Sequence, residues 1–331
     1  MKNMKICVIS LGLFGDVIAR TPVIRALKEK YPNSKITVVV DKIGYEILKN
    51  NPYIHEIITM DRKKSNYLKY IYFKISTQIK LIIRRFDLMI DLYNGSSSRS
   101  MAKLSFAKQN IKNKKGTNVY NFKNPLHMTN SLFEMISDIK FDNVDISPDF
   151  FINKYIYKNS QKFQNSYLLS LGSGDLNKIL SFDKTFKLIK HIYKNYALIP
   201  TIVQNPGQEF LQEKLINEYL IPNEIPYIKL DKKSIDELAI IIKNSKFIIV
   251  PDTGIMHLSF ALKTPVFCVF TETNPIIVEP ENDNIILKSS YKLANPPIYD
   301  RNGVPKCTGD IEIKTIIKDF DEFMGILKSK S

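Results

Sequence analysis

The stretch from Lys246 to Leu262 constrains the fold more than any other part of the chain. A short apolar run ends at Val250, the turn Pro251-Asp252-Thr253-Gly254 follows, and the segment from Met256 has helical spacing. A second apolar run, Pro265 to Phe270, comes directly afterwards, so the turn is predicted to join a strand to a helix inside a βαβ unit. Units of this kind build parallel sheets that are covered by helices.

This turn is the first candidate binding site. The first backbone N–H groups of a helix have no partner inside the helix, so such a terminus attracts anions, phosphate above all. Thr253 adds a hydroxyl, Gly254 adds flexibility, and His257 stands where it could donate to a phosphate, although a lone His is more often structural. Ligands of open α/β sheets bind beyond the carboxyl ends of the strands. The second half is therefore expected to bind a phosphate-bearing ligand.

The length of 331 residues exceeds the usual size of one core, so two domains are expected. Strands are predicted at 5–10, 35–40, 56–60 and 86–92 in the first half, and at 167–171, 198–204, 227–230, 247–250 and 266–270 in the second. Helices are predicted over 15–30, around 45–49, and over 67–85, 99–107, 256–262 and 311–330. Residues 110–165 are less regular and are predicted to hold the last helix of the first domain and then the linker, and 280–305 look loop-rich. The alternation predicts an α/β fold with two Rossmann-like domains, residues 1–160 and 161–331, whose parallel sheets face a central cleft.

The formal charge of +15 could attract nucleic acid, an anionic membrane or an acidic substrate, or it could be compositional. Because no nucleic-acid-binding module is recognisable, we disfavour nucleic acid as a partner. Three cysteines make no disulfide framework, and no pair has metal-ligand spacing, so we expect a cytoplasmic protein without a metal. The chain also has no apolar run of about 18 residues, so no transmembrane span is expected.

A second candidate site is the first strand–helix turn, Ser10 to Val17. Gly12 and Gly15 allow a tight turn, and the helix dipole stabilises the charged form of Asp16 at the helix start. Asp16 could be a helix-capping residue or a catalytic base, and the turn alone favours the cap. The spacing Gly-x-x-Gly is not the dinucleotide fingerprint Gly-x-Gly-x-x-Gly, which disfavours a dehydrogenase.

Two further turns follow strands of the second half. In the first, Ser173 offers a hydroxyl and Lys178 could neutralise phosphate charge; in the second, Glu209 could accept hydrogen bonds from a ribose diol. A solvated loop and a first-turn Glu are the alternatives. There is no Asp-x-Asp pair at a strand end that would suggest a divalent metal, so Lys178 and helix N-terminal amides would have to carry the charge of a diphosphate.

Four motifs in order resemble glycosyltransferase family 9, the heptosyltransferases of the lipopolysaccharide inner core. They are Ile9 to Leu27, Asn51 to Ile57, Phe86 to Leu92, and Asp252 to Leu258 with Ala261 to Pro265. The resemblance covers most of the chain. It implies a GT-B fold, an N-terminal acceptor-binding domain and a C-terminal donor domain, with the last helix packing back on the N-terminal domain.

The resemblance also implies a reaction. A metal-independent, inverting enzyme would transfer a heptose or related sugar from a nucleotide-sugar, ADP-heptose, to lipopolysaccharide core or a similar anionic glycan. It would have Asp16 as general base. Lys178 and Ser173 would hold the departing diphosphate with Thr253, Gly254 and His257. Glu209 would contact the donor ribose, and Asp252 would orient its turn or contact the sugar. An anionic glycolipid acceptor would bring the enzyme to the cytoplasmic face of the inner membrane.

Departures from the family pattern leave alternatives open. Thr271-Glu272-Thr273-Asn274-Pro275 stands where the family favours Gly-Pro-Thr-Asp-Pro, and Glu272 would be electrostatically awkward beside a diphosphate. A UDP- or GDP-type donor used in capsule or other surface glycan synthesis, or a nucleotide-sugar epimerase, are therefore the enzymatic alternatives. A basic nucleic-acid-binding protein is the non-enzymatic one.

Overall fold

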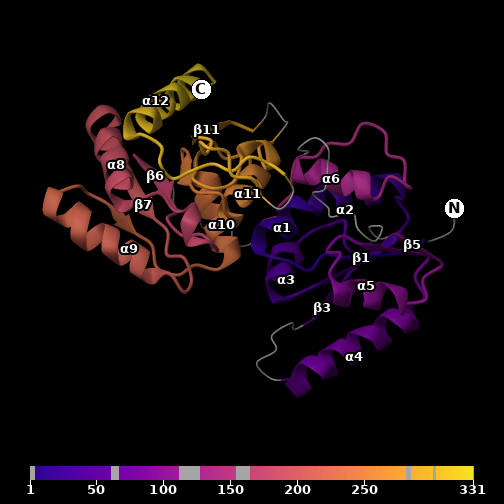
Figure 1. Ribbon diagram of the computed structural model, residues 1–331. Coiled ribbons are helices and arrows are strands. Elements are labelled where there is room, and N and C mark those ends of the chain that lie inside the picture. The colour runs from indigo at the N-terminus through magenta and orange to yellow at the C-terminus, as the bar shows by residue number, and fades with distance from the viewer. Residues whose placement is uncertain are drawn as a thin grey trace. The chain divides into compact units, whose positions relative to one another are not determined.

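The computed structural model describes residues 4–60, 67–111, 127–153, 165–280, 285–300 and 303–330. They form two compact units, Met1–Phe151 and Ile152–Ser331, each built around its own sheet (Figure 1). Every described strand pair in both sheets is parallel. The predicted α/β fold with two parallel sheets is thus confirmed.

The first unit has a five-stranded sheet in the order β3-β2-β1-β4-β5. Its strands are β1 (Lys5–Ile9), β2 (Lys35–Val40), β3 (Glu56–Thr59), β4 (Leu88–Asp91) and β5 (Gln109–Ile111). Its helices are α1 (Phe14–Ala19), α2 (Thr21–Lys30), α3 (Lys42–Leu48), α4 (Tyr67–Arg84), α5 (Ser96–Lys103) and α6 (Met128–Met135). Because the strand order reverses at β1, the carboxyl end of β1 is a switch point of the kind that binds ligands.

The second unit has a six-stranded sheet in the order β11-β10-β9-β6-β7-β8. Its strands are β6 (Ser166–Leu169), β7 (Ile199–Ile202), β8 (Ile228–Lys229), β9 (Ile248–Val250), β10 (Val266–Phe270) and β11 (Leu287–Tyr291). Its helices are α8 (Phe182–Tyr196), α9 (Glu209–Leu215), α10 (Ile235–Asn244), α11 (Gly254–Ala261) and α12 (Ile313–Ser329), with short turns such as η1 (Leu176–Lys178). Here the order reverses at β6.

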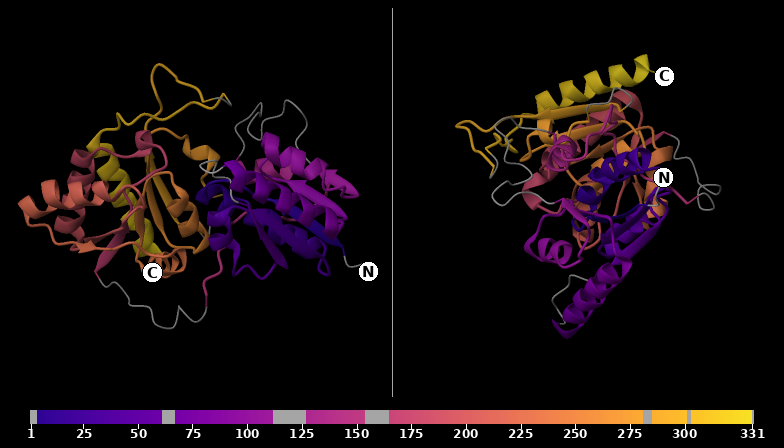
Figure 2. Two further views of the ribbon diagram at one scale, coloured as in Figure 1. Left: turned by 90° about the horizontal axis from the view of Figure 1, so that it is seen from below. Right: turned by 90° about the vertical axis from the view of Figure 1, so that its right-hand side faces the viewer.

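Each sheet is covered on both faces, which is why its central strands are continuous apolar runs. Cys7 in β1 and Cys268 in β10 are completely buried. Along one face of the second sheet, α12 packs on β10, β11 and α8 (Figure 2). Its Phe320 ring meets that of Phe267 edge to face at 5.2 Å between centroids, and Phe323 packs beside them. Burying one such side chain stabilises the fold by about 2 kcal/mol. The further prediction that α12 reaches the N-terminal domain stays a prediction.

One predicted helix is wrong in its continuity. The segment 15–30 forms two helices, with α1 ending at Ala19 and α2 beginning at Thr21. Pro22 lies in the first turn of α2, where its missing N–H costs nothing because that donor has no intrahelical partner. In the middle of one long helix the same proline would clash with the preceding turn. The break sets Arg20 at the junction.

Two strands lie where irregular structure was predicted or no element was placed. β5 and β11 each lie at one edge of their sheet, and both are rich in polar residues. An edge strand needs no continuous apolar run, so the pattern that revealed the central strands is absent from them.

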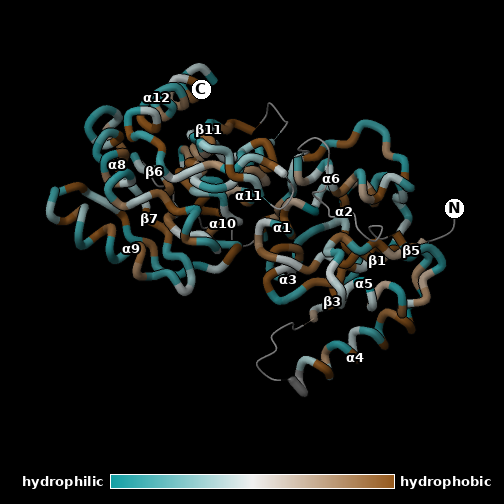
Figure 3. The backbone as a smooth tube through the Cα atoms, viewed as in Figure 1, coloured by the Kyte–Doolittle hydropathy of each residue, from teal (hydrophilic) through white to brown (hydrophobic). Residues whose placement is uncertain are grey.

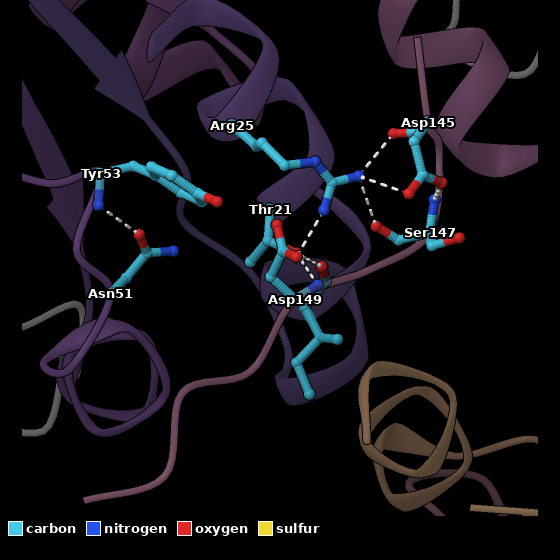
Figure 4. A network of polar contacts seen from close by, with 8 residues as sticks. Thr21, Arg25, Asn51, Tyr53, Asp145, Ser147 and Asp149 are labelled. Carbon is cyan, nitrogen blue, oxygen red and sulfur yellow. Dashed lines mark hydrogen bonds and ion pairs between the residues drawn. The ribbon is translucent and has the colours of Figure 1, made fainter. Parts of the chain in front are cut away.

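A polar clip fastens the end of the first unit to α2 (Figure 4). The guanidinium of Arg25 forms an ion pair with Asp149 and donates to the carbonyl oxygens of Asp145 at 2.6 Å and Ser147 at 3.0 Å. The backbone N–H of Asp149 donates to Thr21 Oγ1 at 2.7 Å. Burial raises the pKa of Asp149, and the opposing effect of Arg25 offsets this only in part. The clip holds the chain segment that leads out of the unit.

Candidate active site

The turn between β9 and α11 has the predicted strand–helix form. Thr253 is the N-cap of α11 in extended conformation, and α11 begins at Gly254. The Thr253 hydroxyl makes no capping bond, and Oγ1 is buried without a partner among the described residues. The side chain at this cap therefore leaves the first helical N–H groups available for an anion.

Asp252 is the centre of a buried polar cluster beside this turn. Its Oδ2 accepts from Lys178 Nζ at 2.5 Å and from Thr273 Oγ1 at 2.6 Å. Burial by itself would raise the pKa of Asp252, but the charges of Lys178 and His257, with the two hydrogen bonds, together hold it below its ordinary value. The cluster thus keeps Asp252 as a carboxylate and places an ammonium group beside the helix N-terminus.

Sheet order explains why these residues meet. β6, β9 and β10 are neighbouring parallel strands, so the loops that leave their carboxyl ends lie side by side. Lys178 comes from the loop after β6, Asp252 from the loop after β9 and Thr273 from the loop after β10. A further bond, from Thr271 Oγ1 to the carbonyl oxygen of Asn177 at 2.7 Å, ties the outer two loops together.

His257 lies one turn into α11 and is buried. Its ring meets Phe260 edge to face, with 6.0 Å between centroids, and its charge helps to lower the pKa of Asp252. This position fits either predicted role of His257, a structural one or a hydrogen-bond donor to a phosphate.

Ser173 and Glu209 lie on the β7 side of the switch point. The carbonyl oxygen of Ser173 accepts from Gln208 Nε2 at 2.7 Å. A Cβ at the preceding Gly172 would lie 2.3 Å from Asn205 Nδ2, so a larger residue there would displace the Asn205 side chain. Glu209 opens α9 and is exposed; hydrogen bonds from its own N–H and that of Gly207 lower its pKa. No described contact links Glu209 to the Asp252 cluster.

In the first unit, Asp16 and Arg20 converge on Gly12. Asp16 Oδ2 accepts from the N–H of Leu13 at 3.0 Å, which is the capping geometry. A Cβ at Gly12 would lie 2.9 Å from that oxygen and 3.0 Å from Arg20 Nη1, so a larger residue would displace one of them. Gly15 lies in the first turn of α1 and is half-buried. Capping of α1 is therefore observed, and catalysis by Asp16 stays a prediction.

Arg20 and Asp91 complete this end of the first sheet, and the sequence reasoning missed both. Arg20 is buried and its Nη1 donates to the carbonyl oxygen of Leu11. Asp91 ends β4, in register with Ile9 of β1. Burial raises the pKa of Asp91, against hydrogen bonds from Asn94 and Ser98 and the charge of Arg20. The position of Asp91 at the end of a predicted strand could have pointed to this residue. Arg20 gave no such signal, because it lies inside the segment that was predicted to be one continuous helix.

Glu272 is paired with a cation in this fold. Its Oε1 accepts from Lys306 Nζ at 2.7 Å, and this hydrogen bond raises the pKa of Lys306. Lys306 therefore offsets the negative charge locally.

The described residues contain no group of three or more His, Cys, Asp and Glu side chains placed to hold a metal ion. Within the same residues, no helix is both long and apolar enough to cross a membrane.

Residues 213–302, which include Asp252 to His257 and Thr273, match the profile of glycosyltransferase family 9 (heptosyltransferase). The chain therefore resembles glycosyltransferase family 9 over these residues. Among curated proteins it is similar to lipopolysaccharide heptosyltransferase 3 of Escherichia coli, with 20% identity over 301 residues, 82% of this chain and 85% of that one.

Two solved structures share the fold of this chain. A glycosyl transferase family 9 protein from Veillonella parvula superposes with a TM-score of 0.78 at 16% identity, covering 97% of both chains. The ADP-heptose lipopolysaccharide heptosyltransferase II of Escherichia coli gives 0.75 at 14% identity, covering 99% of this chain and 100% of that one. The predicted GT-B fold class is confirmed at this level.

Proposed function

We propose that the chain is an inverting, metal-independent glycosyltransferase that moves a heptose or related sugar from ADP-heptose to lipopolysaccharide core or a similar anionic glycan. The observation that carries the proposal is the Lys178–Asp252–Thr273 cluster beside the N-terminus of α11. It offers an ammonium group and helix N–H groups at the carboxyl ends of three adjacent strands, which suits a departing diphosphate. The E. coli relative named for ADP-heptose supports this choice of donor.

Within this proposal the second unit binds the donor. Lys178, Ser173 and the first N–H groups of α11, with Thr253, Gly254 and His257, hold the diphosphate. Glu209 accepts hydrogen bonds from the ribose diol. Asp252 orients Lys178, because its carboxylate holds the Lys178 ammonium at 2.5 Å. Removing Asp252 would then weaken donor binding through a misplaced lysine.

The first unit supplies the base and binds the acceptor. Asp16 takes the proton of an acceptor hydroxyl, and the oxygen forms a bond to the anomeric carbon on the face opposite the diphosphate. The bond from that carbon to the phosphate oxygen breaks, and its electron pair leaves with the diphosphate. Lys178 and the helix N–H groups stabilise the negative charge that develops there. Attack on the opposite face gives inversion.

The acceptor is proposed to be an anionic glycolipid at the cytoplasmic face of the inner membrane. A formal net charge of +15 supports this assignment, since a positive protein is attracted to acceptor phosphates, carboxylates and an anionic leaflet.

The test combines donor binding with transfer. ADP, UDP, GDP, CMP and NAD are compared by thermal shift with and without Mg²⁺, and ADP is expected to stabilise selectively whether or not Mg²⁺ is present. Asp16→Asn should then abolish transfer from ADP-heptose while ADP stabilises it as it does the wild type. Substantial residual transfer would remove Asp16 from the base role, and selective stabilisation by UDP or GDP would change the donor.

A further inference from the structure

The helix α4 exposes an apolar stripe, defined here as Tyr72, Ile75, Ile79, Ile82 and Ile83. At 100° per residue these five positions fall within an arc of about 100° on one side of the helix. Ile75, Ile79 and Ile83 are 55%, 50% and 70% exposed. Apolar residues alternate with polar ones along α4 in Figure 3. A continuous exposed stripe of this kind marks an interaction surface rather than scattered surface residues.

The opposite side of α4 is already packed on the first unit. Thr77 and Leu81 are buried, and Leu81 belongs to the core cluster that contains Phe86 and Met101. Gln78 Nε2 donates to the carbonyl oxygen of Met101 at 3.4 Å, and Arg84 forms an ion pair with Glu56. The helix α4 therefore has two apolar sides. One packs on the first unit, and the other, the stripe, faces solvent.

The surroundings of the stripe are basic. Neither α4 nor α5 contains an acidic residue. Lys80 on α4, Arg85 directly after it, and Arg99 and Lys103 on α5 are all exposed. The segment after α5 exposes two further apolar side chains, Leu104 at 50% and Phe106 at 73%. An apolar stripe flanked by Lys and Arg is typical of helices that lie in the head-group region of an anionic membrane.

We propose that the stripe of α4 is a membrane-docking surface that inserts into the head-group region of an anionic bilayer, with Lys80 and its basic neighbours facing lipid phosphates. A second copy of the chain fits this face less well. An isologous dimer would set each basic rim against the same basic rim of its partner, which is unfavourable. The proposal deepens the proposed function, because a glycolipid acceptor is held in such a bilayer.

Vesicle co-sedimentation of the full chain tests the proposal. Vesicles of phosphatidylcholine alone are compared with vesicles of equal parts phosphatidylcholine and phosphatidylglycerol. The wild type is expected to bind the anionic vesicles, and Ile79→Gln/Ile83→Gln should weaken that binding by about tenfold or more, because two apolar side chains no longer insert. Lys80→Gln should weaken it by about fivefold.

The matched control is Ile221→Gln/Ile298→Gln, which changes two isoleucines of the second unit that are 55% and 58% exposed. It should bind vesicles like the wild type. Absence of wild-type binding to anionic vesicles, or unchanged binding by Ile79→Gln/Ile83→Gln, would overturn the proposal. So would a wild-type dimer in analytical ultracentrifugation that the same variant dissociates, since the stripe would then join two copies.

A separate assay keeps this proposal apart from the proposed function. With a lipid-free, water-soluble acceptor, Ile79→Gln/Ile83→Gln should transfer sugar at the wild-type rate. If the wild type itself transfers no sugar to any acceptor, the proposed function fails, while the vesicle result still decides the role of the stripe.

Discussion

At the scale of single residues, the pKa of a buried aspartate is shifted in opposite directions in the two candidate sites. Asp252 is kept ionised by Lys178, whereas burial of Asp91 disfavours its charged form. Sequence reasoning found Asp252, Lys178 and Asp16 because each follows an apolar strand. It could not pair Lys178 with Asp252, which lies 74 residues further along the chain, because the strand order that brings their loops together leaves no mark in either motif.

Asp252→Asn is expected to destabilise the second unit by about 3 kcal/mol at neutral pH, since it leaves the half-buried Lys178 without its counter-ion. The pH dependence follows from the lowered pKa of Asp252. The ion pair contributes fully above about pH 5 and is lost as the pH falls below about 4, through the lowered pKa. Urea unfolding at several pH values measures this. Equal stability of variant and wild type at pH 7 would contradict it, and Thr273→Val, which removes one hydrogen bond, should cost only about 1 kcal/mol.

Gly12→Ala tests the geometry around Asp16. The added methyl group would lie 2.9 Å from Asp16 Oδ2 and 3.0 Å from Arg20 Nη1, so one of the two must move. Displacement of Asp16, the proposed base, should lower kcat by about 100-fold with little change in the donor KM. The control is Gly303→Ala, because Gly303 also has a positive φ and a Cβ there meets nothing within 4 Å. Steady-state kinetics of both variants decide the matter: equal kcat values would show that the approach to Gly12 is not needed.

At the scale of helices and strands, periodicity predicted the central elements because those strands are buried on both faces. It failed at β5 and β11, whose polar edge sequences carry no apolar run. It also missed the break at Arg20, since the residues of α1 and α2 keep helical spacing across it. The strand–helix turns of the candidate site were therefore easier to place than the edge strands β5 and β11.

Arg25→Met tests the clip between α2 and the end of the first unit. It removes the cation beside Asp149, whose side chain is only 17% exposed, and leaves that carboxylate without its ion pair. Loss of one partner of a buried pair should cost about 3 kcal/mol. Lys108→Met breaks the surface pair with Asp87, where the lysine is 70% exposed, and should cost less than about 1 kcal/mol. Chemical denaturation compares the two, and similar losses would show that the clip is no stronger than a surface pair.

At the scale of the whole molecule, each unit has its own hydrophobic core. The cluster around Phe267 and Phe320 draws all its members from the second unit, and the cluster around Leu81 and Met89 draws all its members from the first. A unit with a complete core is expected to fold independently.

Residues 152–331 expressed alone are therefore expected to unfold cooperatively and to be stabilised by ADP, but to transfer no sugar, because Asp16 is missing. Thermal denaturation with and without ADP measures the first two properties, and product analysis the third. A broad, non-cooperative transition would show that the second core is incomplete without the first unit. The same fragment carrying Lys178→Ala is the control, and it should lose the response to ADP.

The buried cysteines can report when each unit opens. Cys7 lies in β1, the central strand of the first sheet, and Cys268 lies in β10, next to the edge strand β11 of the second, and burial raises the pKa of both. Cys307 is also buried, and burial raises its pKa to about 11. A thiol reacts with an alkylating reagent through its thiolate, so none of the three cysteines should react until its surroundings open. Peptide mapping of the modified chain would then time the opening of the two sheets separately in one experiment. A cysteine introduced on the surface, with the three native cysteines left in place, is the control and should be labelled first.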